Sequence, residues 1–236
     1  MICPICHNSY YFLLESGGDK LVCRKCGHEG KYTDPSYSDY HEKRYSYSKV
    51  RNIKNDPLLK KIMESKIINK KSLVLDYGCG AGDYTNYVAK LSKMVIGTDI
   101  DVKKAQSRFP KLKWVRIDPK RRNLKFESDK FDVILAVNLI EHVHDFEFLL
   151  NEFERILKKG GYLFITTYDT NFVLHKILND PTHVYEWDEI SFEKFISKKF
   201  KIIKSFKHGS FFNYYPFNKL IVRFLKPELC VVATKN

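Results

Sequence analysis

The sequence predicts an α/β fold, in which a doubly wound sheet of about seven strands follows a small N-terminal module. From residue 73 onward, short β-branched runs alternate with stretches whose apolar residues recur at helical spacing, a pattern typical of parallel sheets. The first 34 residues instead hold two close pairs of cysteines separated by glycine-containing sequence. We therefore divide the 236-residue chain into residues 1–34, 35–72 and 73–236.

The third part contains seven apolar runs of strand length, separated by helical patterns. We expect strands over residues 73–77, 94–99, 113–118, 131–137, 162–167, 201–206 and 229–235, and helices around residues 83–91, 102–108, 144–158 and 189–198. The apolar stripe of DPLLKKIMESKII, residues 56–68, predicts one more helix before the first of these strands.

Three positions mark the expected ends of helices. Asp101 and Asp188 each precede a predicted helix, and aspartate is a favoured N-cap residue. The sequence KKGG at residues 158–161 places cations and then glycines after the helix over residues 144–158. Cations suit the negative end of a helix and glycine adopts the left-handed turn, so KKGG predicts a helix stop.

Two features of the composition bear on location. No apolar run approaches the roughly 20 residues that are needed to span a bilayer. The first residues, MICPICHNSY, lack the basic start and apolar stretch of a signal peptide. We therefore expect a cytoplasmic protein without an integral membrane segment.

The net charge of +13 raises the question of nucleic-acid binding. The excess is concentrated in residues 41–72, which carry ten cations and three anions. Lysine supplies 32 of the 41 cations, and lysine serves solubility as readily as phosphate binding, whereas bidentate readers of phosphates and bases are usually arginines. The charge therefore keeps nucleic acid as an alternative partner without requiring it.

A glycine-rich loop follows the first expected strand of the sheet. Gly78, Gly80 and Gly82 form G-x-G-x-G between this strand and a helix. Glycines let the backbone turn sharply and approach a ligand, and the helix N-terminus directs free N–H groups to the same place. A tight strand-to-helix turn also favours glycine without any ligand, so the loop alone leaves both interpretations open.

Acidic residues near the ends of three successive strands strengthen the ligand interpretation. Asp76 lies just ahead of the loop, Asp99 ends the second expected strand and Asp118 ends the third. A carboxylate at the second position can accept the two hydroxyls of a ribose, and one at the third can accept an exocyclic amine. Three carboxylates at one edge tolerate a cationic ligand and repel a pyrophosphate.

The sequence D-x-G-C-G-x-G, followed by IGTDID, Asp118 and FDVILAVNLIEHV, resembles the class I S-adenosylmethionine-dependent methyltransferases. More narrowly, it is similar to the group that includes quinone, sugar and small-metabolite methyltransferases. The resemblance is close over residues 73 to about 170. It implies a Rossmann-like, seven-stranded sheet whose last strand is antiparallel, with S-adenosylmethionine as the cofactor.

The resemblance also implies roles for individual residues. The glycine loop and Asp76 would cradle the methionine portion of the cofactor, Asp99 the ribose, Asp118 with Ile117 the adenine, and Asn138 the sulfonium side. Glu141 and His142 would open towards the methyl acceptor. The full set of implied cofactor-binding residues is Asp76, Gly78, Cys79, Gly80, Gly82, Asp99, Ile100, Ile117, Asp118 and Asn138.

The four N-terminal cysteines have the spacing C-x2-C-x16-C-x2-C, with Cys3, Cys6, Cys23 and Cys26 as members. This spacing is typical of a structural zinc ribbon, in which four thiolates close a tetrahedron. Disulfides would need an oxidising compartment, which nothing else in the sequence supports, and a redox role is a further alternative. The remaining cysteines, Cys79 and Cys230, are expected to be small buried residues.

The function of the ribbon is left open by its residues. The aromatic run at residues 10–12 can stack bases or pack the ribbon's own core. Residues 35–72, which are rich in tyrosine and lysine, form either a lid over the cofactor or a linker to the first helix.

Two histidines are candidates for contact with the methyl acceptor. His183 lies in DPTHVYEWDEISFEKF, which is similar to the segment that crosses the acceptor pocket in small-molecule methyltransferases, and His142 is the second candidate. Either is a possible general base, and either is equally compatible with an ordinary hydrogen-bonded residue. The aromatic patch over residues 209–227 suits an apolar substrate, a membrane surface, a dimer contact or core packing.

The sequence as a whole favours a methyltransferase that acts on a small or lipid-like metabolite. One alternative is an rRNA or tRNA methyltransferase that holds RNA with the ribbon and residues 41–72. Another is a non-catalytic zinc-ribbon interaction protein.

Overall fold

The computed structural model describes residues 56–118, 124–143, 145–171, 183, 185–209 and 228–236, together with the backbone of three N-terminal strands. These strands, β1 (Tyr10–Glu15), β2 (Gly18–Cys23) and β3 (Glu29–Lys31), form an antiparallel sheet in the order β1-β2-β3. Cys23 ends β2, whereas Cys3, Cys6 and Cys26 lie outside the described residues. The zinc ribbon therefore stays a prediction, as do the roles of residues 35–55 and of residues 210–227, which also lie outside them.

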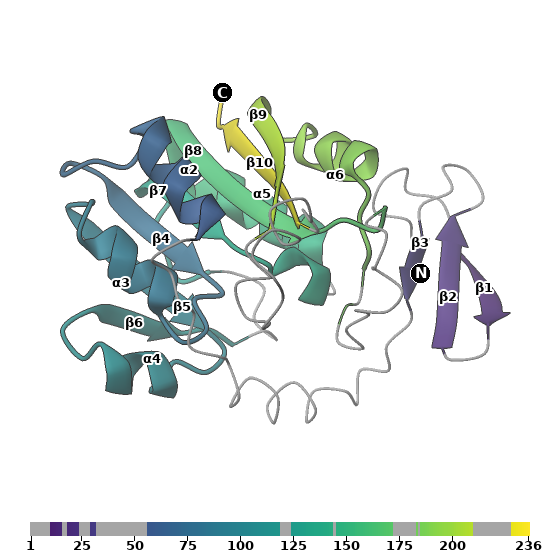
Figure 1. Cartoon of the computed structure of the whole chain (residues 1–236), viewed down its shortest axis with the longest axis horizontal. Helices are drawn as coiled ribbons and strands as arrows, with labels where there is room; N and C mark the ends of the chain where they lie inside the picture. Colours follow the sequence, from purple (N-terminus) through teal and green to yellow (C-terminus); the bar gives the residue numbers. More distant parts are fainter. Residues whose placement is uncertain are drawn as a thin grey trace, which may run out of the picture.

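A seven-stranded sheet forms the centre of the main domain (Figure 1), with the strand order β6-β5-β4-β7-β8-β10-β9. Neighbouring strands from β6 to β8 are parallel, while β10 is antiparallel to both β8 and β9. The predicted sheet with an antiparallel last strand is confirmed. Its strands are β4 (Leu73–Tyr77), β5 (Met94–Asp99), β6 (Lys113–Arg116), β7 (Phe131–Ala136), β8 (Leu157–Tyr168), β9 (Lys201–His208) and β10 (Glu228–Thr234).

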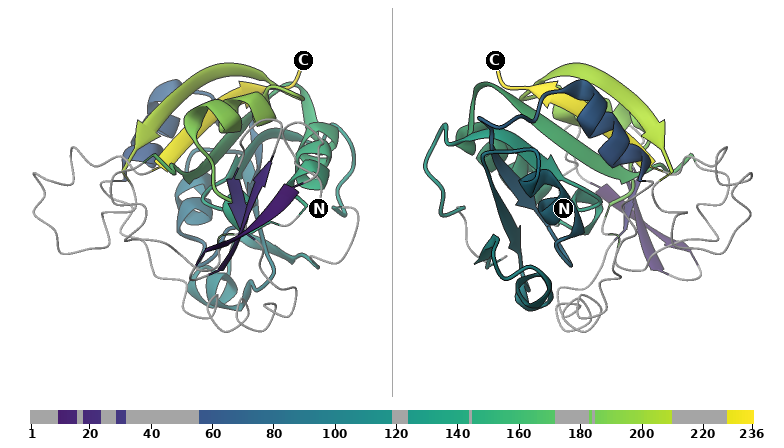
Figure 2. Two further views of the ribbon diagram at one scale, coloured as in Figure 1. Left: turned by 90° about the vertical axis from the view of Figure 1, so that its right-hand side faces the viewer. Right: turned by 60° about the vertical axis from the view of Figure 1, so that its left-hand side comes forward.

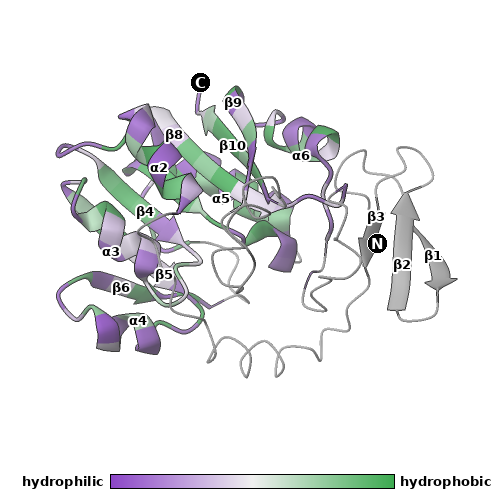
Figure 3. Cartoon of the chain, viewed as in Figure 1, coloured by the Kyte–Doolittle hydropathy of each residue, from purple (hydrophilic) through white to green (hydrophobic). Residues whose placement is uncertain are grey.

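Helices cover both faces of this sheet (Figure 2). One face carries α2 and α3, whose buried side chains join one apolar cluster, and the other carries α5 and α6, whose buried side chains join a second. The strands between them are the most hydrophobic part of the domain (Figure 3). The helices are α2 (Pro57–Ser65), α3 (Asp83–Ala89), α4 (Lys103–Arg108), the 3-10 turn η3 (Ile140–His142), α5 (Phe146–Ile156) and α6 (Glu189–Ile196).

The helix predicted before the first strand is present as α2. Its N-cap is Asp56, whose carboxylate accepts hydrogen bonds from the N–H groups of Leu58 and Leu59. Leu58, Leu59 and Ile62 are almost fully buried, so the apolar stripe seen in the sequence packs against the sheet. The phenol of Tyr84 on α3 donates to the other oxygen of Asp56 over 2.8 Å, which joins the two helices.

The prediction for residues 144–162 is wrong in one respect. The helix ends at Ile156, and the strand that was expected from residue 162 already begins at Leu157. Leu157 is fully buried and pairs with Phe131 on β7, and burial of this side chain overrides the helix stop read from KKGG. Gly160 still adopts a positive φ of 72°, but inside the strand rather than after a helix.

The two predicted caps differ in outcome. Asp188 caps α6 as predicted, because its carboxylate accepts the N–H of Ser191 and the Ser191 hydroxyl accepts the N–H of Asp188. The N-cap of α4 is Val102 rather than Asp101, although the Asp101 carboxylate accepts the N–H of Lys103 over 2.9 Å.

The remaining differences are small. The strand expected over residues 113–118 ends at Arg116, so Asp118 lies two residues beyond it and is exposed.

Within the described ranges, no helix is long and apolar enough to cross a membrane.

Candidate active site

The glycine loop lies between β4 and α3, at the carboxyl edge of the parallel strands. Gly78, Gly80 and Gly82 all have positive φ angles, of 80°, 52° and 81°. The N–H groups of Gly78 and Cys79 donate to the carbonyl of Thr98 at the end of β5, over 2.8 and 2.9 Å. The loop is therefore fixed to the neighbouring strand by its own backbone.

Two of the glycines are required by space as well as by φ. A Cβ atom on Gly78 would lie 2.7 Å from Leu139, and one on Gly82 would lie 2.6 Å from the Trp114 ring. These contacts are shorter than packed carbon atoms tolerate. The loop is thus packed closely by Leu139, which follows β7, and by Trp114 in β6.

Asp99 ends β5 beside this loop and is almost fully buried. Its carboxylate accepts the N–H of Gly80 over 2.8 Å and that of Asp101 over 3.3 Å. Burial raises the pKa of this carboxyl group, and the backbone hydrogen bonds partly oppose that effect. Ile100, which follows it, is half-buried. A buried carboxylate at this position fits the ribose contact that the sequence predicts.

Asp76 and Cys79 are both buried at the same edge. The Asp76 carboxylate accepts a 2.5 Å hydrogen bond from the hydroxyl of Thr85 in α3. Burial, followed by the charges of Asp76 and Asp99, raises the pKa of the Cys79 thiol, so this cysteine is a neutral packing residue and not a thiolate nucleophile. The expectation that Cys79 and Cys230 are buried is confirmed.

Arg108 binds the end of the glycine loop that leads into α3. The sequence did not predict this role. Its guanidinium donates to the carbonyl of Ala81 and to the carboxylate of Asp83, each over 2.7 Å. Arg108 ends α4, more than twenty residues after the loop. No local pattern connects the two, so only the tertiary structure reveals this contact.

Of the residues predicted to bind the cofactor, the pair assigned to the adenine includes the exposed one. Ile117 is half-buried, and its N–H donates to the carbonyl of Asp99, while Asp118 is exposed. The segment after Asp118, residues 119–123, lies outside the described residues. The structure thus brings both residues to the edge that holds Asp99.

Asn138 stands just beyond β7 with a positive φ of 50°. Its amide nitrogen donates to Glu228 on β10 over 2.6 Å, and its amide oxygen accepts from the hydroxyl of Thr166 over 2.7 Å. The next residue, Leu139, is the one that packs against Gly78. The predicted sulfonium-side residue therefore lies next to the glycine loop and is held by two strands on its other side.

The two candidate histidines lie together although they are 41 residues apart in the sequence. The ring centroids of His142 and His183 are 4.9 Å apart, and Glu141 is buried beside them. One ligand atom from each of these three residues lies within 4.8 Å of the others, a donor set that suits a divalent cation or the hydroxyl of a methyl acceptor. The Tyr185 N–H donates to the Glu141 carbonyl, which joins the two segments.

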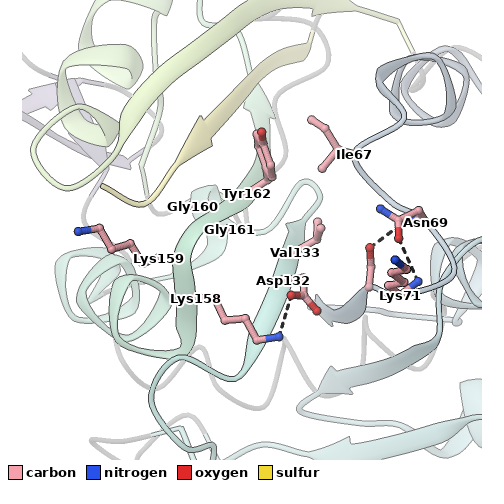
Figure 4. Close-up of a pocket in the computed structure, with 11 residues that line it drawn as sticks. Ile67, Asn69, Lys71, Asp132, Val133, Lys158, Lys159, Gly160, Gly161 and Tyr162 are labelled. Atoms are coloured by element: carbon pink, nitrogen blue, oxygen red, sulfur yellow. Dashed lines mark hydrogen bonds and ion pairs between the residues drawn. The ribbon is translucent and has the colours of Figure 1, made fainter.

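A separate hollow lies at the opposite edge of the sheet (Figure 4). It is lined by the amino ends of β7 and β8, including Asp132, Lys158 and Gly161, and the Lys158 ammonium pairs with Asp132 over 2.7 Å. Open α/β sheets bind ligands at the carboxyl ends of their strands, so this hollow is not the candidate active site.

Comparison with known proteins agrees with this arrangement. Residues 75–165, which run from β4 through the glycine loop to β8, match the family of the methyltransferase domain. This stretch is similar in sequence to the methyltransferase domain, and it makes up less than half of the 236-residue chain. The match includes the glycine loop, Asp99, Asn138 and both Glu141 and His142.

Two curated relatives extend the likeness in sequence. The ubiquinone biosynthesis O-methyltransferase of Pelagibacter ubique (strain HTCC1062) is 38% identical over 114 residues, which cover 45% of this chain and 46% of that protein. An uncharacterized protein of Methanocaldococcus jannaschii is 32% identical over 146 residues, 61% of this chain and 62% of that protein. The chain therefore spans about half to three fifths of the length of these relatives.

Solved structures show that the main domain of this chain shares its fold with proteins of more than one activity. An S-adenosylmethionine-dependent methyltransferase from Mesorhizobium loti has a TM-score of 0.61 at 16% identity, covering 76% of this chain and 96% of that one. The [4+2]-cyclase SpnF has a TM-score of 0.59 at 16% identity, covering 76% and 80%. At such identities the likeness shows the fold alone, and the activity must be argued from the site.

Proposed function

We propose that this protein transfers a methyl group from S-adenosylmethionine to a small or lipid-like metabolite. The observation that carries the proposal is the glycine loop with Asp99 beside it. Neighbouring side chains pack so closely against the loop backbone that a Cβ atom on Gly78 or Gly82 would collide with them. Asp99 is a buried carboxylate at the end of the adjacent strand. A cationic cofactor with a ribose fits this set of groups better than a pyrophosphate does.

The cofactor residues that we propose are those of this edge. Asp76 and the glycine loop, including Cys79, hold the methionine portion, and Asp99 with Ile100 holds the ribose. Ile117 and Asp118 border the adenine, and Asn138 borders the sulfonium. When bound, S-adenosylmethionine supplies a methyl group that is already activated, so the chain mainly has to align the acceptor and exclude water.

The acceptor side is proposed to be the cluster of Glu141, His142 and His183. His183 is almost fully buried, and its ring lies 5.1 Å from that of Tyr168 and 4.9 Å from that of His142. An imidazole here can take the proton of an acceptor hydroxyl while the oxygen attacks the methyl group in line. This role fits an oxygen acceptor, as the name of the Pelagibacter relative indicates for that protein.

The same cluster suits a divalent cation, and one experiment separates the two roles. Methyl transfer to a panel of catechols and hydroxyquinols is measured after dialysis against a chelator and again with added Mn²⁺. Transfer that survives chelation assigns proton removal to the imidazoles. Transfer that requires Mn²⁺, and binding of Mn²⁺ that is lost in His183→Ala, assigns the cluster to cation binding.

Cofactor binding tests the proposed function itself. Calorimetry of the full chain with S-adenosylmethionine should show one site, and Gly78→Val should abolish binding because the side chain collides with Leu139. Gly160→Val is the matched control, since Gly160 has a similar φ and nothing within 4 Å of its Cβ position. A wild-type chain that binds no S-adenosylmethionine would refute the proposal.

RNA is the second candidate acceptor, because residues 41–72 carry ten cations and the ribbon precedes them. If RNA is the acceptor, affinity should fall steeply with salt, and deletion of residues 1–34 should abolish methylation. A small acceptor whose methylation is insensitive to salt excludes this candidate. The third candidate is a non-catalytic interaction protein, and it requires that the chain does not bind S-adenosylmethionine.

A further inference from the structure

Three polar side chains form a line across the carboxyl edge of the sheet, at the ends of three different strands. Asn138 follows β7, Glu228 begins β10 and His208 ends β9. The Asn138 amide donates to one Glu228 oxygen over 2.6 Å, and the other Glu228 oxygen lies 3.3 Å from Nδ1 of His208. In the strand order, the line runs outward from β7 to β9 with the carboxylate in the middle.

The line is enclosed by the protein. Glu228 has no exposed surface, and His208 is 3% exposed. Burying a carboxylate is costly unless hydrogen bonds and an opposite charge compensate for it. Glu228 is therefore buried at a cost in stability, at the first position of a strand whose next five residues are buried and apolar.

The inner end of the line lies at the cofactor edge. Asn138 has a positive φ, and its neighbour Leu139 packs directly against Gly78 of the glycine loop. The hydroxyl of Thr166 on β8 accepts the backbone N–H of Asn138 over 2.9 Å and donates to the side-chain amide oxygen of Asn138 over 2.7 Å. Asn138 is therefore fixed, and in the order of contacts that starts at Asn138 the Glu228 carboxylate precedes the His208 imidazole. The Glu228 carboxylate is thus the charged group of the line that contacts Asn138 directly.

We infer that Glu228 is a buried counter-charge that makes the site prefer the cationic cofactor to its neutral product. This inference rests on the proposed function, because it concerns the sulfonium that Asn138 borders. S-adenosylmethionine carries a positive sulfonium, whereas S-adenosylhomocysteine has an uncharged thioether in its place. A carboxylate in a poorly hydrated interior attracts the first more strongly than a surface charge would, and it has no charge to attract in the second. After transfer of the methyl group, the product S-adenosylhomocysteine therefore binds to the site less tightly than S-adenosylmethionine does.

Calorimetry with three ligands tests this inference without any methyl acceptor. The ligands are S-adenosylmethionine, S-adenosylhomocysteine and sinefungin, which carries an ammonium group where the sulfonium methyl would be. Glu228→Gln keeps the size of the side chain and removes its charge. We expect the two cationic ligands to bind about tenfold more weakly, and S-adenosylhomocysteine to change by less than about twofold.

Thr166→Val is the matched control, because it loosens Asn138 without changing any charge. It should weaken binding of all three ligands by similar factors. If Glu228→Gln does not fold, Glu228→Asp withdraws the carboxylate from Asn138 while keeping the charge buried, and it should reduce the preference for the cations in the same direction.

The outcomes are distinct. Equal weakening of all three ligands in Glu228→Gln, or no weakening at all, overturns the inference and leaves the proposed function standing. A wild-type chain that binds neither S-adenosylmethionine nor S-adenosylhomocysteine overturns the proposed function and the inference with it.

Discussion

Asp99 is a buried carboxylate, and its burial destabilises the folded protein when the group is charged. Burial raises its pKa above the ordinary value of 3.8, which means that the folded chain holds the proton of this group more tightly than the unfolded chain does. Stability therefore falls as the pH rises from the unfolded to the folded pKa, and the penalty persists above both.

Replacement of this carboxylate should separate stability from binding. We predict that Asp99→Asn keeps or raises the free energy of unfolding at pH 7, because the amide oxygen still accepts the N–H of Gly80 and no charge is buried. Cofactor affinity should fall by about 1–3 kcal/mol, the range for losing a charged hydrogen bond. Denaturant unfolding and calorimetry measure the two effects. Unchanged affinity would show that Asp99 does not hold the ribose.

At the residue scale, the sequence was informative where a residue is explained by its neighbours in the chain. The glycine loop and Asp99 follow from strand ends, and the structure places them in contact. Arg108, Glu228 and His208 were missed because their partners are distant in sequence. For Glu228 one signal was present, since a charged residue opens a strand that is otherwise apolar.

The loop connecting β4 and α3 depends on both the φ angle and the space of its glycines. Gly82 has a φ of 81° and little room for a Cβ atom, whereas Gly160 has a φ of 72° and open space around it. The two positions therefore differ mainly in packing.

Alanine at these two positions should separate strain from collision. Gly160→Ala should cost about 1 kcal/mol of stability, from the positive φ alone. Gly82→Ala should cost about 1–3 kcal/mol more, because its Cβ meets Trp114 at 2.6 Å. Thermal unfolding of both variants checks this difference. Equal losses would mean that Trp114 moves aside freely.

The start of α6 offers a prediction that depends on the capping box. Asp188→Ala removes the acceptor for the Ser191 N–H and should destabilise the domain by about 1 kcal/mol. Ser197→Ala, at the exposed end of the same helix, should change stability by less than about 0.5 kcal/mol. A loss in Asp188→Ala no greater than in Ser197→Ala would contradict the assigned cap.

Element boundaries followed the sequence except where tertiary burial decided them. The caps at Asp56 and Asp188 lie in local sequence, and both helices begin where local chemistry favours them. The switch from α5 to β8 at Leu157 depends on the partner strand β7, which local sequence does not contain. The contact between His142 and His183 likewise joins residues that are distant in sequence.

For the whole molecule, the N-terminal cysteines and the methyltransferase domain are predicted to be separable in function. Cys23→Ser should release the zinc that the four-cysteine spacing predicts, while S-adenosylmethionine affinity changes by less than about threefold, because the described cofactor edge involves no residue before β4. Metal analysis and calorimetry on the same sample measure both. Collapse of cofactor binding would make the ribbon a part of the methyltransferase fold.

The central claim is methyl transfer to a small or lipid-like acceptor. The most direct measurement incubates the chain with methyl-labelled S-adenosylmethionine and separate RNA, protein and small-molecule or lipid fractions of a cell extract. We predict label in the small-molecule or lipid fraction, reduced at least about tenfold in His183→Ala. Label in RNA alone, or cofactor binding with no label in any fraction, would contradict the account.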